Sequence, residues 1–272
     1  MQESERTFNH LKIHTQYSIC EGAIKIDDLK NYCKENKIKS AGLSDTSNLC
    51  GSLEFSENLS KSGTQPIIGT QILFKYNEEI GLLPLIAKSE AGYKRIIDLS
   101  SKSYLNNDQV LEPYCNFNDL LNESNDTIIL SGSINCLIGK LFNKAKFSEI
   151  ETIYKNLKKI YKDNFYIEIQ RHNDQNEKSF ETYNLELSKK YEIPIIATQE
   201  VYYLDKSMHD AHEALICIGK KTYLNDKNRV TFSNQHYLKS SDEMNKLFSD
   251  LPSTFVFLRP RSPQIVTIRY FV

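Results

Sequence analysis

Short apolar runs rich in β-branched residues alternate with longer amphipathic segments over residues 8–218. Seven of these runs have the length and composition of β-strands. They begin near Leu11, Ser40, Pro66, Leu82, Thr127, Phe165 and Pro194. The segments between them have helical spacing, so the pattern predicts repeated βα units around a parallel sheet or barrel. The expected fold class is α/β, and seven strands separated by helices favour a distorted (β/α)7-type barrel.

The clearest helical pattern covers residues 147–161, where apolar side chains recur at i, i+3, i+4 and i+7 and Lys and Glu fill the other face. Two further helices are expected over residues 89–104 and 51–63. Ser89 is suited to begin the first, and Gly63 to end the second.

Composition and charge narrow the classes of function. The chain has 272 residues, of which 40% are hydrophobic, enough to build a core. Its net charge of -1 excludes the strongly basic balance that by itself indicates nucleic-acid binding, so any DNA contact is local or belongs to another segment. The first residues lack the apolar run of a signal peptide, and no stretch reaches the roughly 18 apolar residues of a membrane span. We expect a soluble, cytoplasmic protein without membrane contact.

Six cysteines are scattered along the chain without a C-x-x-C pair. This usage is typical of reduced, structural thiols and not of a disulfide framework or a zinc knuckle.

Residue usage changes near residue 252. Residues 253–272 contain no Lys, Asn, Asp or Glu but hold three of the seven arginines, so residues 1–252 carry a net charge of -4 and the tail +3. We interpret the tail as the product of a frameshift, a truncated reading frame or a chimeric join, with a natural edge strand as the alternative. The expected organisation is one domain over residues 1–252 and a divergent tail over 253–272.

Candidate chemistry begins on the first strand. His10, Lys12 and His14 alternate along it and share one face. An H-x-H pair on a strand face is a common metal-binding arrangement, but a protonated Lys12 has no lone pair to donate. By itself, His14 is better interpreted as a hydrogen-bonded histidine at a barrel mouth, where sites in such folds lie.

At these residues a resemblance becomes specific. The chain is similar to the PHP domain of bacterial DNA polymerase III alpha subunits, in seven blocks that follow the family's order over about residues 8–252. The blocks are FNHLKIHTQYSICEG (8–22), LSDTSNLCGSLEF (43–55), GTQPIIGTQI (63–72), LSGS (130–133), FYIEIQRH (165–172), IIATQEVYYL (195–204) and HDAHEALICIGK (209–220). The resemblance implies the barrel of the PHP superfamily.

Metal-competent PHP domains bind several ions through His, Asp, Glu and Cys side chains and use them to hydrolyse phosphoesters. The resemblance places those ligands at nine positions of this chain, which hold Lys12, His14, Glu21, Thr46, Gln71, Ser133, His172, Glu200 and Tyr202. Five of these residues are poor ligands, and the four that remain suitable are His14, Glu21, His172 and Glu200.

We therefore expect no catalytic residue and no bound metal cluster. The ammonium of Lys12 is predicted to replace the metal and to pair with Glu21 or Glu200, because at about 4 Å its repulsion of a cation is about 4 kcal/mol even at an effective dielectric near 20. If a single cation binds, its expected ligands are the four remaining suitable residues.

A second histidine pair lies near the end of the α/β pattern. His209 and His212 share one helix face and offer a ligand pair at i, i+3 spacing. We favour a structural role, as a cap or an inter-helix hydrogen bond.

The resemblance implies an N-terminal PHP domain of the replicative DNA polymerase III alpha subunit, structural and partner-binding. Its implied partners are the polymerase palm and thumb, a proofreading exonuclease subunit, and DNA through the full-length holoenzyme. The full-length family performs template-directed DNA synthesis with magnesium, whereas this fragment is expected to hold no cofactor and to be inactive alone. The alternatives are a stand-alone metal-dependent PHP phosphoesterase or 3′–5′ exonuclease, and a pure interaction scaffold.

Overall fold

The computed structural model describes residues 8–105, 112–122 and 126–251. The divergent tail predicted over residues 253–272 lies outside the described residues. The strands are β1 (Lys12–Ile13), β2 (Ser40–Thr46), β3 (Gln65–Tyr76), β4 (Glu79–Ala87), β5 (Cys115–Asn116), β6 (Thr127–Leu130), β7 (Phe165–Ile169), β8 (Ile195–Ala197) and β9 (Glu200–Val201). The helices are α1 (Ile26–Glu35), α2 (Ser52–Lys61), α3 (Glu90–Leu105), α4 (Asn118–Leu121), α5 (Leu137–Asn143), α6 (Phe147–Tyr161), α7 (Glu177–Tyr191), α8 (His209–Lys220) and α9 (Ser241–Leu247).

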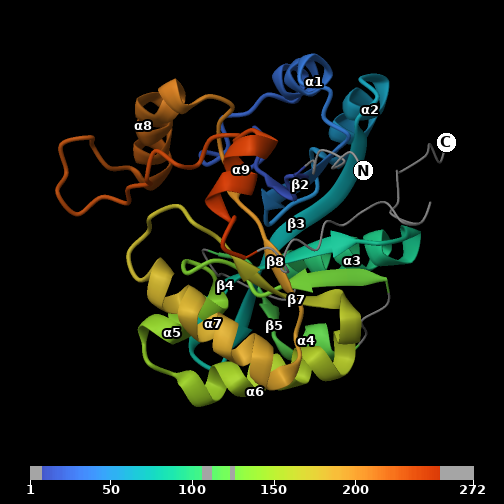
Figure 1. Cartoon of the computed structure of the whole chain (residues 1–272), viewed down its shortest axis with the longest axis vertical. Coiled ribbons are helices and arrows are strands. Elements are labelled where there is room, and N and C mark those ends of the chain that lie inside the picture. The colour runs from blue at the N-terminus through green and yellow to red at the C-terminus, as the bar shows by residue number, and fades with distance from the viewer. Residues whose placement is uncertain (1–7, 106–111, 123–125, 252–272) are drawn as a thin grey trace.

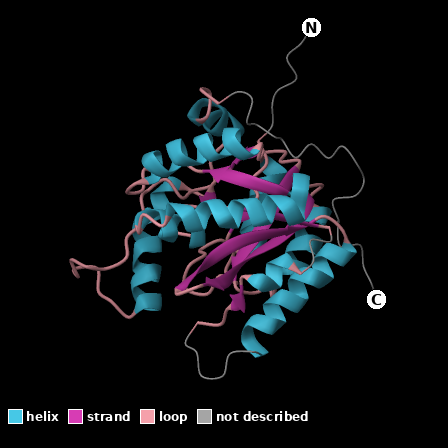
Figure 2. Cartoon of the chain, turned by 90° about the horizontal axis from the view of Figure 1, so that it is seen from below, coloured by secondary structure: helices cyan, strands magenta, loops and turns pink. Residues whose placement is uncertain are grey.

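The strands form one mixed sheet in the order β8-β7-β6-β4-β3-β2-β1-β9, with β5 paired to β3. The two ends of this order, β8 and β9, are separated by only two residues of chain. The sheet therefore curls until its edges meet, which gives the distorted barrel that the sequence predicts. Helices surround the strands in both views (Figures 1 and 2).

One strand departs from the predicted parallel arrangement. β4 runs antiparallel to both β3 and β6. Only Asn77 and Glu78 separate β3 from β4, and a two-residue connection makes a hairpin but cannot cross over to a parallel neighbour. Asn77 has φ +53°, a left-handed conformation that Asn tolerates better than most residues. The expectation of a wholly parallel sheet was therefore wrong at β4.

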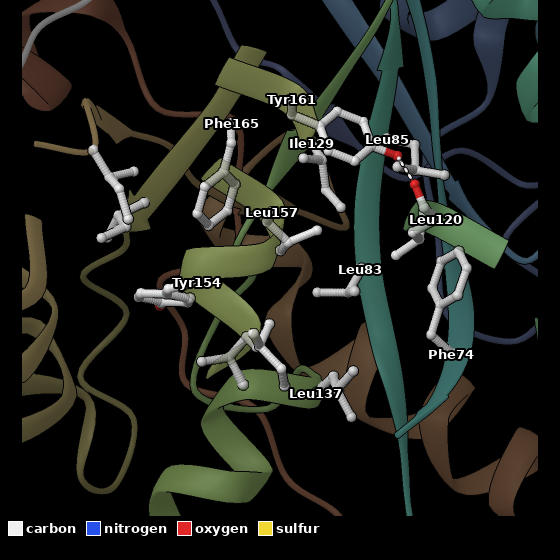
Figure 3. Close-up of a cluster of buried hydrophobic side chains, with 14 of the residues drawn as sticks. Phe74, Leu83, Leu85, Leu120, Ile129, Leu137, Tyr154, Leu157, Tyr161 and Phe165 are labelled. Atoms are coloured by element: carbon white, nitrogen blue, oxygen red, sulfur yellow. Dashed lines mark hydrogen bonds between the residues drawn. The ribbon is translucent and has the colours of Figure 1, made fainter. Parts of the chain in front are cut away.

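The helix predicted over residues 147–161 is confirmed as α6, and its apolar face is buried at Ile150, Ile153, Tyr154 and Leu157. Figure 3 shows this face packed against the outside of the sheet. There the hydroxyl of Tyr161 donates to the backbone carbonyl of Leu120, 3.1 Å away. Along this face, the burial of each large apolar side chain contributes roughly 1.5–3 kcal/mol.

The two faces of the sheet carry different side chains. The outward face packs under the helices in two large apolar clusters. The inward face holds a smaller apolar cluster deep in the barrel, which includes Ile67, Ile86, Ile128 and Ile196. Side chains alternate along a strand, so every second residue faces the inside of the barrel. On the parallel strands, the inward residues near the carboxyl ends lie at the mouth of the barrel, and these residues are polar. Apolar side chains thus fill the floor of the barrel, and the polar side chains that could form a functional site lie at its mouth.

Two further expectations concern thiols and membranes. All six cysteines are free thiols, as predicted from their spacing. Across the described part of the chain, no helix combines the length and the apolar character that crossing a bilayer requires.

Candidate functional site at the barrel mouth

The polar residues of the mouth come from strands that are neighbours in the sheet. Lys12 of β1 is in register with Glu200 of β9, and Thr46 of β2 is in register with Gln71 of β3. We call the central group the Lys12 pocket, which consists of Lys12, His14, Gln71, Glu168 and Glu200. All five residues are buried.

Lys12 is fully buried and lies between two carboxylates. Its Nζ is 2.5 Å from Glu200 Oε1 and 3.2 Å from Glu168 Oε1. Burial disfavours the charged ammonium, but the charges of Glu168 and Glu200 outweigh it and raise the pKa of Lys12 above its ordinary value. The predicted ion pair with Glu200 is confirmed. Glu168 was not anticipated, and the other predicted partner, Glu21, instead accepts a hydrogen bond from the Thr46 hydroxyl at 2.7 Å.

Glu200 is held from several sides. Besides Lys12, its carboxylate accepts from His14 Nε2 at 2.6 Å and from Gln71 Nε2 at 3.0 and 3.1 Å. Burial alone would raise the pKa of this carboxyl group, but the charges of Lys12 and then His14 lower it well below its usual range. Glu200 is therefore an ionised carboxylate whose oxygens are already engaged by protein donors.

His14 is fixed through Ser18 and Asp45. The Ser18 hydroxyl donates its single proton to Asp45 Oδ1 at 2.7 Å, so Ser18 accepts from His14 Nδ1, 3.2 Å away. The other ring nitrogen, Nε2, faces the ionised Glu200, which can only accept. Both ring nitrogens of His14 are thus engaged by protein groups, Nδ1 by the Ser18 hydroxyl and Nε2 by Glu200 and by Gln71 Nε2, which lies 3.0 Å away. Tyr202 stacks on this ring with 4.4 Å between centroids.

Cys136 was missed by the sequence reasoning. The resemblance puts the family's cysteine ligand at Ser133, and the hydroxyl of Ser133 lies 3.4 Å from the Cys136 thiol. That thiol is buried and donates to Gln71 Oε1 at 3.8 Å. Burial raises its pKa, so it is held as a neutral thiol and not as the thiolate that binds metals.

A second polar group, the histidine cluster, lies beside the Lys12 pocket and consists of His172, Asp174 and His236. One ligand atom from each of the three lies within 4.8 Å of the others. The two imidazole rings are stacked, with centroids 4.1 Å apart and planes at 4°. Of the four residues expected to hold a single cation, only His172 belongs to this cluster.

The histidine cluster joins the Lys12 pocket through the backbone of Glu200. The Glu200 N–H donates to His172 Nε2 at 3.2 Å, and His236 Nδ1 lies 3.3 Å from the Glu200 carbonyl. Burial lowers the pKa of His172 to about 3 and that of His236 well below its usual value, so both rings are neutral. Burial, followed by the negative charge of Glu177, raises the pKa of Asp174 to about 6.

His209 and His212 do not form a ligand pair. His209 Nε2 donates to the carbonyl of Phe232 at 3.0 Å, and His212 Nε2 donates to the carbonyl of Glu21 at 2.9 Å. Both bonds are structural, but they reach carbonyls in loops and are neither the cap nor the inter-helix hydrogen bond that was favoured. The bond from His212 ties α8 to the loop after β1.

Comparison with known proteins places this arrangement in a family. A model of the PHP domain matches residues 10–172, more than half of the chain. The chain belongs to the PHP domain family. It is 33% identical over 258 residues to the DNA polymerase III subunit alpha of Caulobacter vibrioides, covering 90% of this chain and 22% of that protein. It is 36% identical over 247 residues to the subunit of the same name from Rickettsia conorii, covering 90% and 21%.

The chain thus spans about a fifth of the length of the curated relatives that it matches. The matching part is the N-terminal region of those subunits. Among solved structures, it is similar to a two-domain protein from Bacteroides vulgatus that contains a predicted PHP-like metal-dependent phosphoesterase. That likeness has a TM-score of 0.47 and 11% identity, and covers 88% of this chain and 62% of the other.

The residues of the Lys12 pocket do not fit the metal cluster that PHP phosphoesterases use. An ammonium lies against Glu200, both ring nitrogens of His14 are engaged by protein groups, and Gln71 Nε2 donates to the same carboxylate. An ion here would have to displace three protein donors from Glu200, and Lys12 would remain beside it as a buried like charge.

Proposed function

We propose that this chain is a non-catalytic PHP module of a DNA polymerase III alpha subunit, in which an ammonium has replaced the hydrolytic metal cluster. The observation that carries the proposal is the position of Lys12, fully buried with its Nζ 2.5 Å from Glu200 Oε1. A metal ion bound at the position of Glu200 would need free lone pairs on its carboxylate oxygens, and here those lone pairs accept from protein donors.

The groups of the Lys12 pocket pair with one another. The ammonium of Lys12 lies against the carboxylates of Glu168 and Glu200, and His14 Nε2 bonds the Glu200 carboxylate. Glu168 is held further by the hydroxyl of Thr198 and by Gln170 Nε2. A buried network of ion pairs and hydrogen bonds fixes the strands that contribute to it, so we assign the pocket a structural role in holding β1 and β9 against β7.

The partners proposed for this module are those of a replicative polymerase. We infer that it packs against the palm and thumb of the subunit, offers a surface to a proofreading exonuclease subunit, and meets DNA through the assembled holoenzyme. Template-directed synthesis with magnesium belongs, in this proposal, to the remainder of the polymerase. The names of the relatives and the 90% coverage of this chain support the assignment.

The test separates a structural module from a hydrolase. The full 272-residue chain is incubated with bis(p-nitrophenyl) phosphate and with 3′-labelled single-stranded DNA, in Mn²⁺, Zn²⁺ or Mg²⁺, and separately with primed template and nucleotides. No hydrolysis and no primer extension are expected. Metal-dependent hydrolysis that His14→Ala abolishes would instead establish a phosphoesterase or a 3′–5′ exonuclease, and template-dependent extension would refute the non-polymerising role.

A further inference from the structure

We propose that His172, Asp174 and His236 bind one divalent transition-metal ion of the zinc type, beside the Lys12 pocket and not within it. The proposal goes beyond the structural role of the module, because it adds a ligand site. Its donors share only His172 with the nine positions inferred from the family resemblance.

The first observation is an unsatisfied nitrogen. His236 is 2% exposed, and its Nε2 finds no hydrogen-bond partner among the residues that the structure describes. Its Nδ1 faces the Glu200 carbonyl and must therefore carry the proton, which leaves Nε2 with a lone pair. A buried acceptor without a donor costs about 1–3 kcal/mol, and an ion at that lone pair would remove the cost.

The second observation is that both histidines make the supporting hydrogen bond of a metal ligand, although the rings are stacked and one must turn before both lone pairs meet an ion. A ligating histidine usually donates its other ring N–H to a carboxylate or a backbone carbonyl. His236 donates to the carbonyl of Glu200, and His172 Nδ1 donates to Glu177 Oε1 at 3.3 Å. Glu177 is itself fixed, since its other oxygen accepts the backbone N–H groups of His172 and Asn173 at 2.7 and 2.8 Å.

The nitrogen of His172 that would bind the ion already accepts a hydrogen bond. Its Nε2 accepts the N–H of Glu200 at 3.2 Å, the long end of the range for such bonds. Binding would exchange this weak bond for a metal bond and release the Glu200 amide. The amide resonance of Glu200 is therefore expected to move on binding, whereas amides on α6, on the outside of the barrel, stay in place.

The third observation is the donor set. Asp174 brings a carboxylate oxygen within 4.8 Å of a ring nitrogen of each histidine. Two imidazoles with one carboxylate are a donor set suited to Zn²⁺ or Co²⁺ and not to Mg²⁺.

The experiment uses the 272-residue chain, stripped with a chelator and then titrated with Zn²⁺ by calorimetry and with Co²⁺ by visible absorption. One ion per chain is expected. Asp174→Asn and His236→Gln should each weaken binding at least about 10-fold, and Glu177→Gln should weaken it about 10- to 100-fold by freeing His172. The matched control is Asp163→Asn, whose side chain is fully exposed. Circular dichroism verifies that each variant is folded, and Asp174→Asn changes only one atom of a half-buried side chain.

A second variant separates this site from the inherited ligand positions. Glu21→Gln removes a carboxylate that belongs to the inherited set but not to the histidine cluster, and it should leave the affinity unchanged. The proposal is overturned if the chain binds no ion, or if Asp174→Asn and His236→Gln bind as the wild type does, or if Glu21→Gln abolishes binding. Hydrolysis by the wild type would contradict the proposed function alone, so the two ideas fail separately.

Discussion

The Lys12 pocket and the histidine cluster lie side by side at the barrel mouth and meet at one residue, Glu200. On one side, the Glu200 carboxylate receives Lys12, His14 and Gln71. On the other, the Glu200 peptide group bonds two neutral histidines. In the first group the central carboxylate is engaged by protein donors, whereas the second retains a buried nitrogen, His236 Nε2, without a hydrogen-bond partner among the described residues. In our proposal, the ammonium of Lys12 takes the place of a metal in one part of the mouth, and the adjacent part binds a cation.

The difference predicts where the fold depends on charge. Removing one partner from a buried ion-pair network leaves the remaining charge buried without a counter-charge, which is strongly destabilising. Removing a group from the histidine cluster takes away hydrogen bonds but leaves no buried ion without a partner. The largest losses of stability should therefore arise in the Lys12 pocket.

The largest expected effect is that of Lys12→Met. The apolar side chain fits the length of Lys but leaves Glu168 and Glu200 unpaired with the ammonium, so the free energy of unfolding should fall by about 3–5 kcal/mol. Urea unfolding followed by circular dichroism measures the change. Lys61→Met is the control, because Lys61 is 59% exposed and its pair with Glu57 contributes less than about 0.5 kcal/mol. Equal losses in the two variants would show that the pocket is not a buried ionic network.

The next effect is expected at Glu177, which supports the histidine cluster. Its carboxylate accepts the backbone N–H groups of His172 and Asn173 in the loop before α7, and Glu177→Ala leaves them without that acceptor. We expect a loss of about 2–3 kcal/mol in the free energy of unfolding. Glu186→Ala on the same helix is the control, since that side chain is exposed and its loss should stay within about 0.5 kcal/mol. A Glu177 variant no less stable than this control would contradict the assignment.

Neutral buried histidines and the Lys12 pocket should lose their contributions to stability at different pH values as the solution is acidified. Burial lowers the pKa of His10 to about 4, so the unfolded chain, with a histidine pKa near 6.5, binds the proton first. The stability due to neutral His10 is complete above pH 6.5 and is lost as pH falls towards 4. The lowered pKa of Glu200 acts in the same direction but only below about pH 4.3, its unfolded value.

The measurement is urea unfolding from pH 7.5 to 4.5. Below pH 6.5, each buried neutral histidine should lower the free energy of unfolding by about 1.4 kcal/mol per pH unit. His10→Gln should reduce the slope by the contribution of one histidine. The variant is compared with its own value at pH 7.5, so the cost of the substitution itself does not enter. An unchanged slope would mean that His10 is already charged, or exposed, in the folded protein.

Local patterns were sufficient to predict much of the fold. α6 has the predicted bounds because its apolar spacing and its burial follow the same helical period. α2 and α3 lie within a residue or two of the predicted ranges, since Gly63 with φ +80° follows α2 and the Ser89 hydroxyl accepts the Gly92 N–H at the beginning of α3. The direction of β4 was missed, although the two-residue connection at Asn77 contained the necessary information. β9 is only two residues long, too short for any pattern of alternation to reveal.

The site was predicted in part. The pairing of Lys12 with Glu200 followed from the family resemblance together with the chemistry of an ammonium, but Glu168 reaches Lys12 through the folded barrel, 156 residues away in sequence. Asp174 follows His172 closely and could have been suspected from its position. His236 could not, because it stands 64 residues beyond His172 and only the path of the chain back over the mouth brings the two rings together.

The smallest expected effect concerns Arg171, which precedes the histidine cluster and ties it to α9. Its guanidinium pairs with Glu181, bonds Asp250 at 2.7 and 2.9 Å, and donates to the Leu247 carbonyl at 2.7 Å. Arg171→Lys keeps the charge but loses the planar fork, so a loss of about 1 kcal/mol is expected, concentrated locally. Hydrogen exchange should quicken in α9 and not in α6, which serves as the internal control. Equal acceleration of both helices would show that Arg171 stabilises the whole barrel. The ion pairs of Arg171 would then matter to the whole fold, as the buried ion pairs of Lys12 are expected to.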